Sequence, residues 1–69
     1  MNYFSDNIIF LRKKKGLTQE EFAKSVGISR NMIASYENKV RLPKLDTLIA
    51  ISNIYNISID DLLKKKMKL

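Results

Sequence analysis

One stretch of the chain, Gly27–Asn38, combines helical spacing with an unusual set of polar side chains. Its apolar residues recur on one side of a helix, and the other side carries short side chains led by an arginine. The residues of that other side are Arg30, Asn31, Ala34 and Ser35. The Arg30 guanidinium matches guanine O6 and N7, and the Asn31 amide matches adenine N6 and N7. This pattern indicates a helix face that reads DNA bases; a face packed on another protein is the alternative.

The composition favours an anionic partner and disfavours catalysis. Thirteen Lys and Arg residues against seven Asp and Glu give the 69-residue chain a net charge of +6, which suits nucleic acid or a membrane surface. The chain has no Cys and no His, so the commonest general base is missing and no catalytic constellation can be assembled. We therefore expect no enzyme, no metal and no cofactor. No apolar run approaches the roughly 20 residues of a membrane span, and we expect a cytoplasmic protein.

The elements that position this face are predicted to be helices, because no convincing strand alternation occurs. Phe4, Ile8 and Leu11 form the buried stripe of a first helix, which ends at Gly16. Residues suited to cap helix N-termini precede three later helices: Thr18, Ser29 and Ser58. A further helix follows Pro43 and ends at Asn56. Five short helices predict a compact all-α domain.

The domain is expected to span 1–69, with its core in about 4–63 and a frayed basic tail at 64–69. Within it, only Gly27 and Ile28 separate the second helix from the cap of the third. So short a turn makes the two helices cross steeply, at roughly 90–120°.

The segment LTQEEFAKSVGISRNMIASYEN, followed by P-x-L-x-x-L and ISIDDLL, resembles the Cro/C1-type helix-turn-helix family of phage repressors and small bacterial regulators. The likeness covers about residues 4–63 and depends on the spacing of five residues: Gln19, Ala23, Gly27, Ile33 and Glu37. It implies a lambda-repressor-like fold whose third helix enters the major groove of double-stranded DNA. Two residues depart from the family pattern. Lys39 stands where a glycine is usual, so Asn38 or Lys39 must make that turn, and Lys44 replaces a capping residue.

The resemblance and the helix geometry together assign roles to individual residues. Arg30, Asn31, Ala34 and Ser35 are expected to read bases. The residues expected at the DNA backbone are Gln19, Thr18, Ser29, Asn38, Lys39, Arg41, Lys44 and Lys14. The amide of Gln19 has two further possible partners, Asn31 and Arg30. An ion pair between Arg12 and Glu37, implied by the resemblance, would hold the third helix against the first.

Surplus apolar residues in the last two helices predict a homodimer. The candidate seam consists of Ile49, Ile54, Ile57, Ile59 and Leu63, with Ile9 and Phe10 as another possible partner surface. The function expected from all this is a sequence-specific DNA-binding transcriptional regulator on a two-fold symmetric operator. No small-molecule ligand and no membrane partner are implied. The alternative is an interaction module, antitoxin-like or coactivator-like, that keeps the fold without reading an operator.

Overall fold

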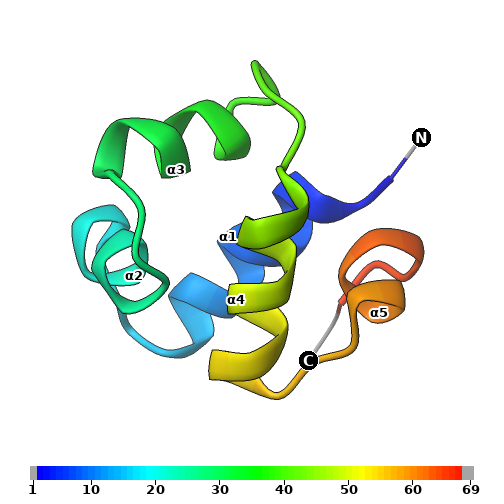
Figure 1. Cartoon of the computed structure of the whole chain (residues 1–69). Coiled ribbons are helices and arrows are strands. Elements are labelled where there is room, and N and C mark those ends of the chain that lie inside the picture. The colour runs from blue at the N-terminus through cyan, green and yellow to red at the C-terminus, as the bar shows by residue number, and fades with distance from the viewer. Residues whose placement is uncertain (1, 68–69) are drawn as a thin grey trace.

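The computed structural model describes residues 2–67, which form five helices without a strand (Figure 1). The helices are α1 (Phe4–Lys14), α2 (Gln19–Ser25), α3 (Arg30–Glu37), α4 (Leu45–Tyr55) and α5 (Ile59–Lys64). The predicted all-α class is therefore confirmed. In this part of the chain no helix has the length and apolar character that crossing a membrane requires.

The predicted helix starts are confirmed at the level of single hydrogen bonds. The hydroxyls of Thr18, Ser29 and Ser58 each accept from the backbone N–H three positions later, at 3.0–3.1 Å. The carboxylate of Glu21 reaches back to the Thr18 N–H at 2.9 Å, which completes a capping box. Lys44 precedes α4 without any side-chain cap, as the sequence indicated.

Four helices end with a residue in the left-handed conformation. Gly16, Gly27 and Asn56 take φ values of +69°, +77° and +55°, which Gly and Asn adopt at least cost. At the end of α3, the sequence left this conformation to Asn38 or Lys39, and Lys39 takes it. Asn38 has φ −86°, and the next residue, Lys39, has φ +63°. The helical path thus continues through Asn38, so the reversal falls one position later.

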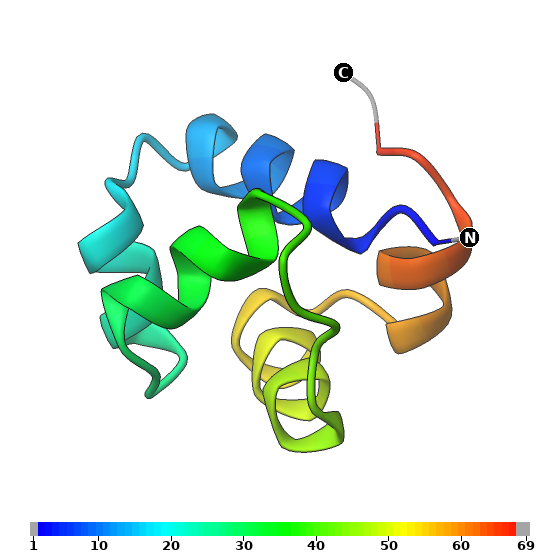
Figure 2. The same ribbon diagram turned by 90° about the horizontal axis from the view of Figure 1, so that it is seen from above.

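The core lies between α1 and the other helices, with α3 and α5 at opposite ends of the molecule (Figures 1 and 2). Its buried apolar residues come from every helix or its immediate ends: Phe4, Ile8, Leu11, Phe22, Ala23, Val26, Ile33, Tyr36, Leu48, Ile51 and Leu62. The rings of Phe4 and Tyr36 meet edge to face at 5.5 Å, which ties α1 to α3. This packing supports α3 from beneath and leaves its other side uncovered.

The buried side chain of Asn7 joins α1 to the C-terminal segment. Its amide nitrogen donates to the carbonyls of Leu62 and Lys65, each at 2.7 Å, and its carbonyl oxygen accepts the N–H of Met67 at 2.8 Å. The frayed tail expected at 64–69 is therefore wrong as far as Met67, because these backbone groups are held by a side chain of α1. The last residues of that tail lie outside the described residues.

Asn7→Ala removes this joint and leaves the buried Leu62 carbonyl without its donor. We expect the free energy of unfolding to fall by about 2 kcal/mol. That loss lowers the melting temperature by roughly 10 °C in a domain of this size. Thermal circular dichroism measures the change. Asn53→Ala, an exposed substitution on α4, is the matched control. Equal melting curves for the two variants contradict the assignment.

Candidate nucleic-acid interface

Helix α3 presents two unlike sides. Ile33 and Tyr36 are fully buried against the core. The four candidate base-reading residues occupy the remaining surface: Arg30 and Asn31, which are exposed, and Ala34 and Ser35, which are half-buried. Short side chains there leave the helix backbone close to the molecular surface, and the hydrogen-bonding side chains of Arg30 and Asn31 stand at the first turn. This is the shape that a helix needs to lie in a groove.

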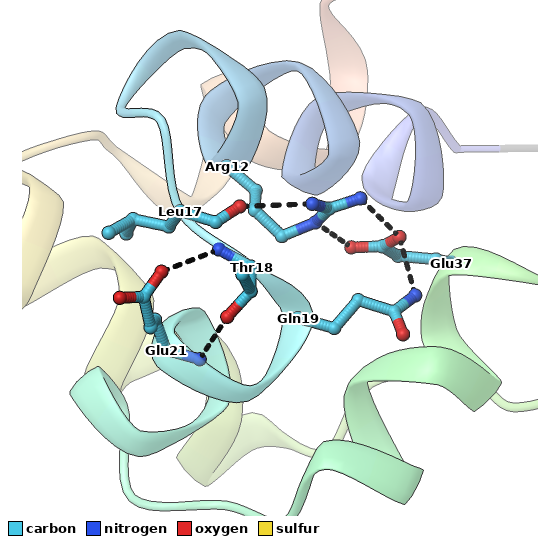
Figure 3. Close-up of polar contacts among 6 residues, drawn as sticks. All are labelled: Arg12, Leu17, Thr18, Gln19, Glu21 and Glu37. Carbon is cyan, nitrogen blue, oxygen red and sulfur yellow. Dashed lines mark hydrogen bonds and ion pairs between the residues drawn. The ribbon is translucent and has the colours of Figure 1, made fainter.

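The carboxylate of Glu37 joins three helices (Figure 3). Arg12 on α1 grips it with two donors, Nε at 2.7 Å and Nη2 at 3.1 Å, and Gln19 on α2 donates from Nε2 at 3.0 Å. The third guanidinium nitrogen of Arg12 donates to the Leu17 carbonyl at 3.0 Å. Only 6% of the Glu37 side chain and 15% of the Arg12 side chain are exposed. The network fixes the end of α3 against α1 and the start of α2.

The position of Gln19 refines what the sequence indicated. Its amide nitrogen binds Glu37 rather than Asn31 or Arg30. A side-chain amide carries two N–H donors, and Glu37 uses one of them. Gln19 is therefore a brace for α3 that keeps a second donor at the first turn of α2.

The joint between α2 and α3 is as short as predicted. The N–H of Ile28 donates to the carbonyl of Ala23 at 3.0 Å across the left-handed Gly27. A Cβ placed on Gly27 meets no atom within 4 Å, so glycine is required by the backbone angle and not by space. Ala23 is 1% exposed at this crossing, where a larger side chain would push the helices apart.

Several polar groups around α3 remain available to a partner. The hydroxyl oxygens of Thr18 and Ser29 accept capping bonds, which leaves their protons free to donate. In the segment of the chain that follows α3, four polar residues are exposed: Asn38, Lys39, Arg41 and Lys44. The Lys39 ammonium is 4.0 Å from the Asp6 carboxylate, a largely exposed contact of the kind that contributes little stability.

Lys14 has different surroundings from the other candidate cations. Its ammonium lies 5.8 Å from the centre of the Phe10 ring. With Lys65 and Lys66, it lines a cavity of about 440 Å³ between α1, the α4–α5 turn and the C-terminal segment. The structure therefore groups Lys14 with the C-terminal lysines.

Comparison with known proteins places this geometry in a family. A helix-turn-helix family model matches residues 8–62, which is most of the chain. The protein belongs to the helix-turn-helix family. The P22 c2 repressor, solved in complex with a synthetic operator, superposes with a TM-score of 0.81 at 33% identity, over 88% of this chain and 92% of that one.

Two curated relatives differ in what their names describe. The transcriptional regulator ImmR of Bacillus subtilis is 46% identical over 78% of this chain and 42% of its own length. The antitoxin PezA of Streptococcus pneumoniae is 43% identical over 81% of this chain and 35% of its own length. The chain spans about half the length, or less, of the first relatives that it matches.

The apolar residues expected to form a dimer seam in this helix-turn-helix protein differ in their exposure. Three are half-buried and pack against the monomer core: Ile57, Ile59 and Leu63. Ile49 and Ile54 are 42% and 57% exposed, but five positions along α4 turn them about 140° apart. Sequence reasoning missed three more exposed apolar residues: Val40, Leu42 and Leu45. Their clustering around a proline-containing loop was a signal in the sequence itself.

Glu37→Ala would strand the buried Arg12 guanidinium and release Gln19. We expect a loss of about 3–5 kcal/mol in the free energy of unfolding. Chemical denaturation of this variant beside Glu20→Ala, which removes an exposed carboxylate from α2, measures the difference. A loss for Glu37→Ala no larger than that for Glu20→Ala would show that the network does not hold α3.

Proposed function

We propose that this chain is a sequence-specific, double-stranded DNA-binding transcriptional regulator that acts as a homodimer on a two-fold symmetric operator. The geometry of α3 supports this most directly. One side of α3 is buried, Glu37 fixes its end through an ion pair, and Arg30 and Asn31 are exposed to solvent. The P22 c2 repressor supports it, because that protein shares the fold at 33% identity and was solved on operator DNA.

In this proposal α3 lies in the major groove and its exposed side reads base edges. The Arg30 fork binds O6 and N7 of a guanine, and the Asn31 amide binds N6 and N7 of an adenine. Ala34 and Ser35 are short enough to let the helix backbone approach, and the Ala34 methyl group suits contact with a thymine methyl.

The polar groups that flank α3 hold the sugar–phosphate backbone. On one side these are the groups at the first turn of α2, Thr18 and Gln19, together with Ser29. On the other side they are Asn38, Lys39, Arg41 and Lys44. Such contacts orient α3 without reading sequence. The cationic ones make binding depend on salt, with a slope that rises by about 0.9 for each phosphate neutralised. Lys14 is the candidate with the least support, because it lies beside Phe10.

A second candidate is an antitoxin-like protein-interaction module. Two observations favour it: the similarity to the antitoxin PezA, and the exposed apolar residues at the α3–α4 loop. Selection of bound duplexes from a random DNA pool separates the two functions. Enrichment of one motif, with binding that resists random competitor DNA, supports the regulator. Weak binding to every duplex alike supports the interaction module.

Arg30→Ala tests the reading face directly. We expect it to weaken binding to the selected site by about 1–3 kcal/mol and to relax base preference at one position in each half-site. Mobility shifts on the selected site and on random DNA measure both effects. Arg41→Ala removes an equal charge from the loop and is the control, since we expect it to weaken both DNAs alike. If Arg30→Ala weakens binding to both DNAs alike, as Arg41→Ala is expected to do, then Arg30 contacts a phosphate and does not read a base.

A further inference from the structure

The cavity between α1, the α4–α5 turn and the C-terminal segment takes no part in the proposed reading of DNA. Its volume is about 440 Å³, which is within the range of pockets that hold small molecules. None of its lining residues belongs to α3. Figure 1 shows the α4–α5 turn at the lower edge of the molecule and α3 at the upper edge. The cavity is therefore separate from the candidate nucleic-acid interface.

One part of the cavity lining is apolar and comes from three segments of the chain. Phe10 belongs to α1, Ile57 to the α4–α5 turn and Met67 to the C-terminal segment. All three residues are half-buried, so each keeps some apolar surface for a ligand. Such surfaces form most of the lining in pockets that bind small molecules. The lining thus gives Phe10, which lies off the buried stripe of α1, a place in a binding site.

The other part of the lining is cationic. Lys14, Lys65 and Lys66 line the cavity together with a single acidic residue, Asp61, so positive charge is in excess. None of the three lysines forms an ion pair with another residue of the range 2–67. The Lys14 ammonium lies 5.8 Å from the centre of the Phe10 ring, close enough for attraction between the cation and the ring. The cavity therefore places positive charge directly beside an aromatic surface.

The C-terminal wall of the cavity is held in place before any ligand binds. The side chain of Asn7 is fully buried, and it bonds the carbonyl of Lys65 at 2.7 Å and the N–H of Met67 at 2.8 Å. These bonds use backbone groups, so the side chains of Lys65 and Lys66 take no part in them. A wall that is already ordered lowers the entropic cost of binding.

Hydrogen-bond donors complete the lining at the α4–α5 turn. The hydroxyl oxygen of Ser58 accepts the N–H of Asp61 at 3.0 Å, which leaves the hydroxyl proton to donate. Asn56 is exposed beside it, and its amide carries two N–H donors. Ammonium, hydroxyl and amide donors together suit a ligand group that accepts hydrogen bonds and carries negative charge.

We propose that this cavity binds a small organic anion, a carboxylate, sulfonate or phosphate ester on an apolar and preferably aromatic body. The three lysines attract the anionic group, and Phe10, Ile57 and Met67 cover the body. Inorganic phosphate has no apolar part to bury. A DNA duplex could bring phosphates to the lysines, but it would leave the apolar lining uncovered. The proposal does not depend on DNA binding by α3.

The test uses the full chain, isotopically labelled, with anilinonaphthalene sulfonate as the probe, because it combines an anionic group with aromatic rings. Two double variants lose the same charge. Lys65→Gln/Lys66→Gln changes the cavity lining, and Lys13→Gln/Lys24→Gln changes exposed residues outside it. Amide resonances locate the probe, and fluorescence measures its affinity. A thermal melt checks that each protein is folded, since this probe also binds partly unfolded chains.

We expect the wild type to bind one probe molecule, with the largest resonance shifts at Phe10 and in residues 56–61 and 65–67. Binding should also raise the melting temperature. Lys65→Gln/Lys66→Gln should weaken the affinity roughly 10-fold, and Lys13→Gln/Lys24→Gln less than about 2-fold. Binding that does not saturate, shifts centred on α3, or equal weakening in the two variants overturns the proposal.

Three further titrations examine the two parts of the ligand. Phenylnaphthylamine, which has the aromatic rings without the sulfonate, should bind at least about 10-fold more weakly than the probe; equal affinity overturns the anionic group. Inorganic phosphate that shifts the same resonances as strongly as the probe overturns the apolar body. A random DNA duplex that shifts them and displaces the probe would make these lysines a second nucleic-acid surface, which overturns the small ligand.

Discussion

The arrangement of the first three helices depends on one buried carboxylate, that of Glu37. Two donors from Arg12 and one from Gln19 surround it, so removal of the charge from water is offset by direct hydrogen bonds. The apolar core alone would let α3 slide or rotate by small amounts, because the hydrophobic effect has no direction. A carboxylate held by a planar guanidinium fork has a preferred geometry. The network therefore sets the angle at which the outer side of α3 faces a partner.

Much of the fold could be predicted from local sequence. Thr18, Ser29 and Ser58 act through neighbours three positions away, so their caps are visible in a single sequence. Gly16 and Gly27 likewise reveal their turns through a conformation that few other residues adopt. The steep joint between α2 and α3 follows from the shortness of the turn that connects them. These features need no knowledge of distant contacts.

The features that were missed depend on contacts between distant parts of the chain. Asn7 continues the buried stripe of α1, yet nothing local shows that it binds backbone groups more than fifty residues away. The partner of the Gln19 amide was also uncertain, because several acceptors and donors lie near the start of α2. The exposure of Val40 runs against the usual inward packing of an apolar residue after a helix, so its clustering with Leu42 and Leu45 near Pro43 is easily overlooked in the sequence. In the candidate site, the sequence identified the surface of α3, and only the coordinates distinguished exposed Arg30 from half-buried Ser35.

The two ends of the described chain lie against each other, through the N–H of Tyr3 on the carbonyl of Leu63 at 2.9 Å and through Asn7 on the segment that ends at Met67. The N-terminal end also borders the loop that follows α3, because Asn2 and Phe4 line a pocket together with Lys39 and Arg41. Chain ends that are neighbours allow a domain to be appended to, or inserted into, another protein without distortion. Evolution or an engineer can therefore attach this unit to proteins of very different length.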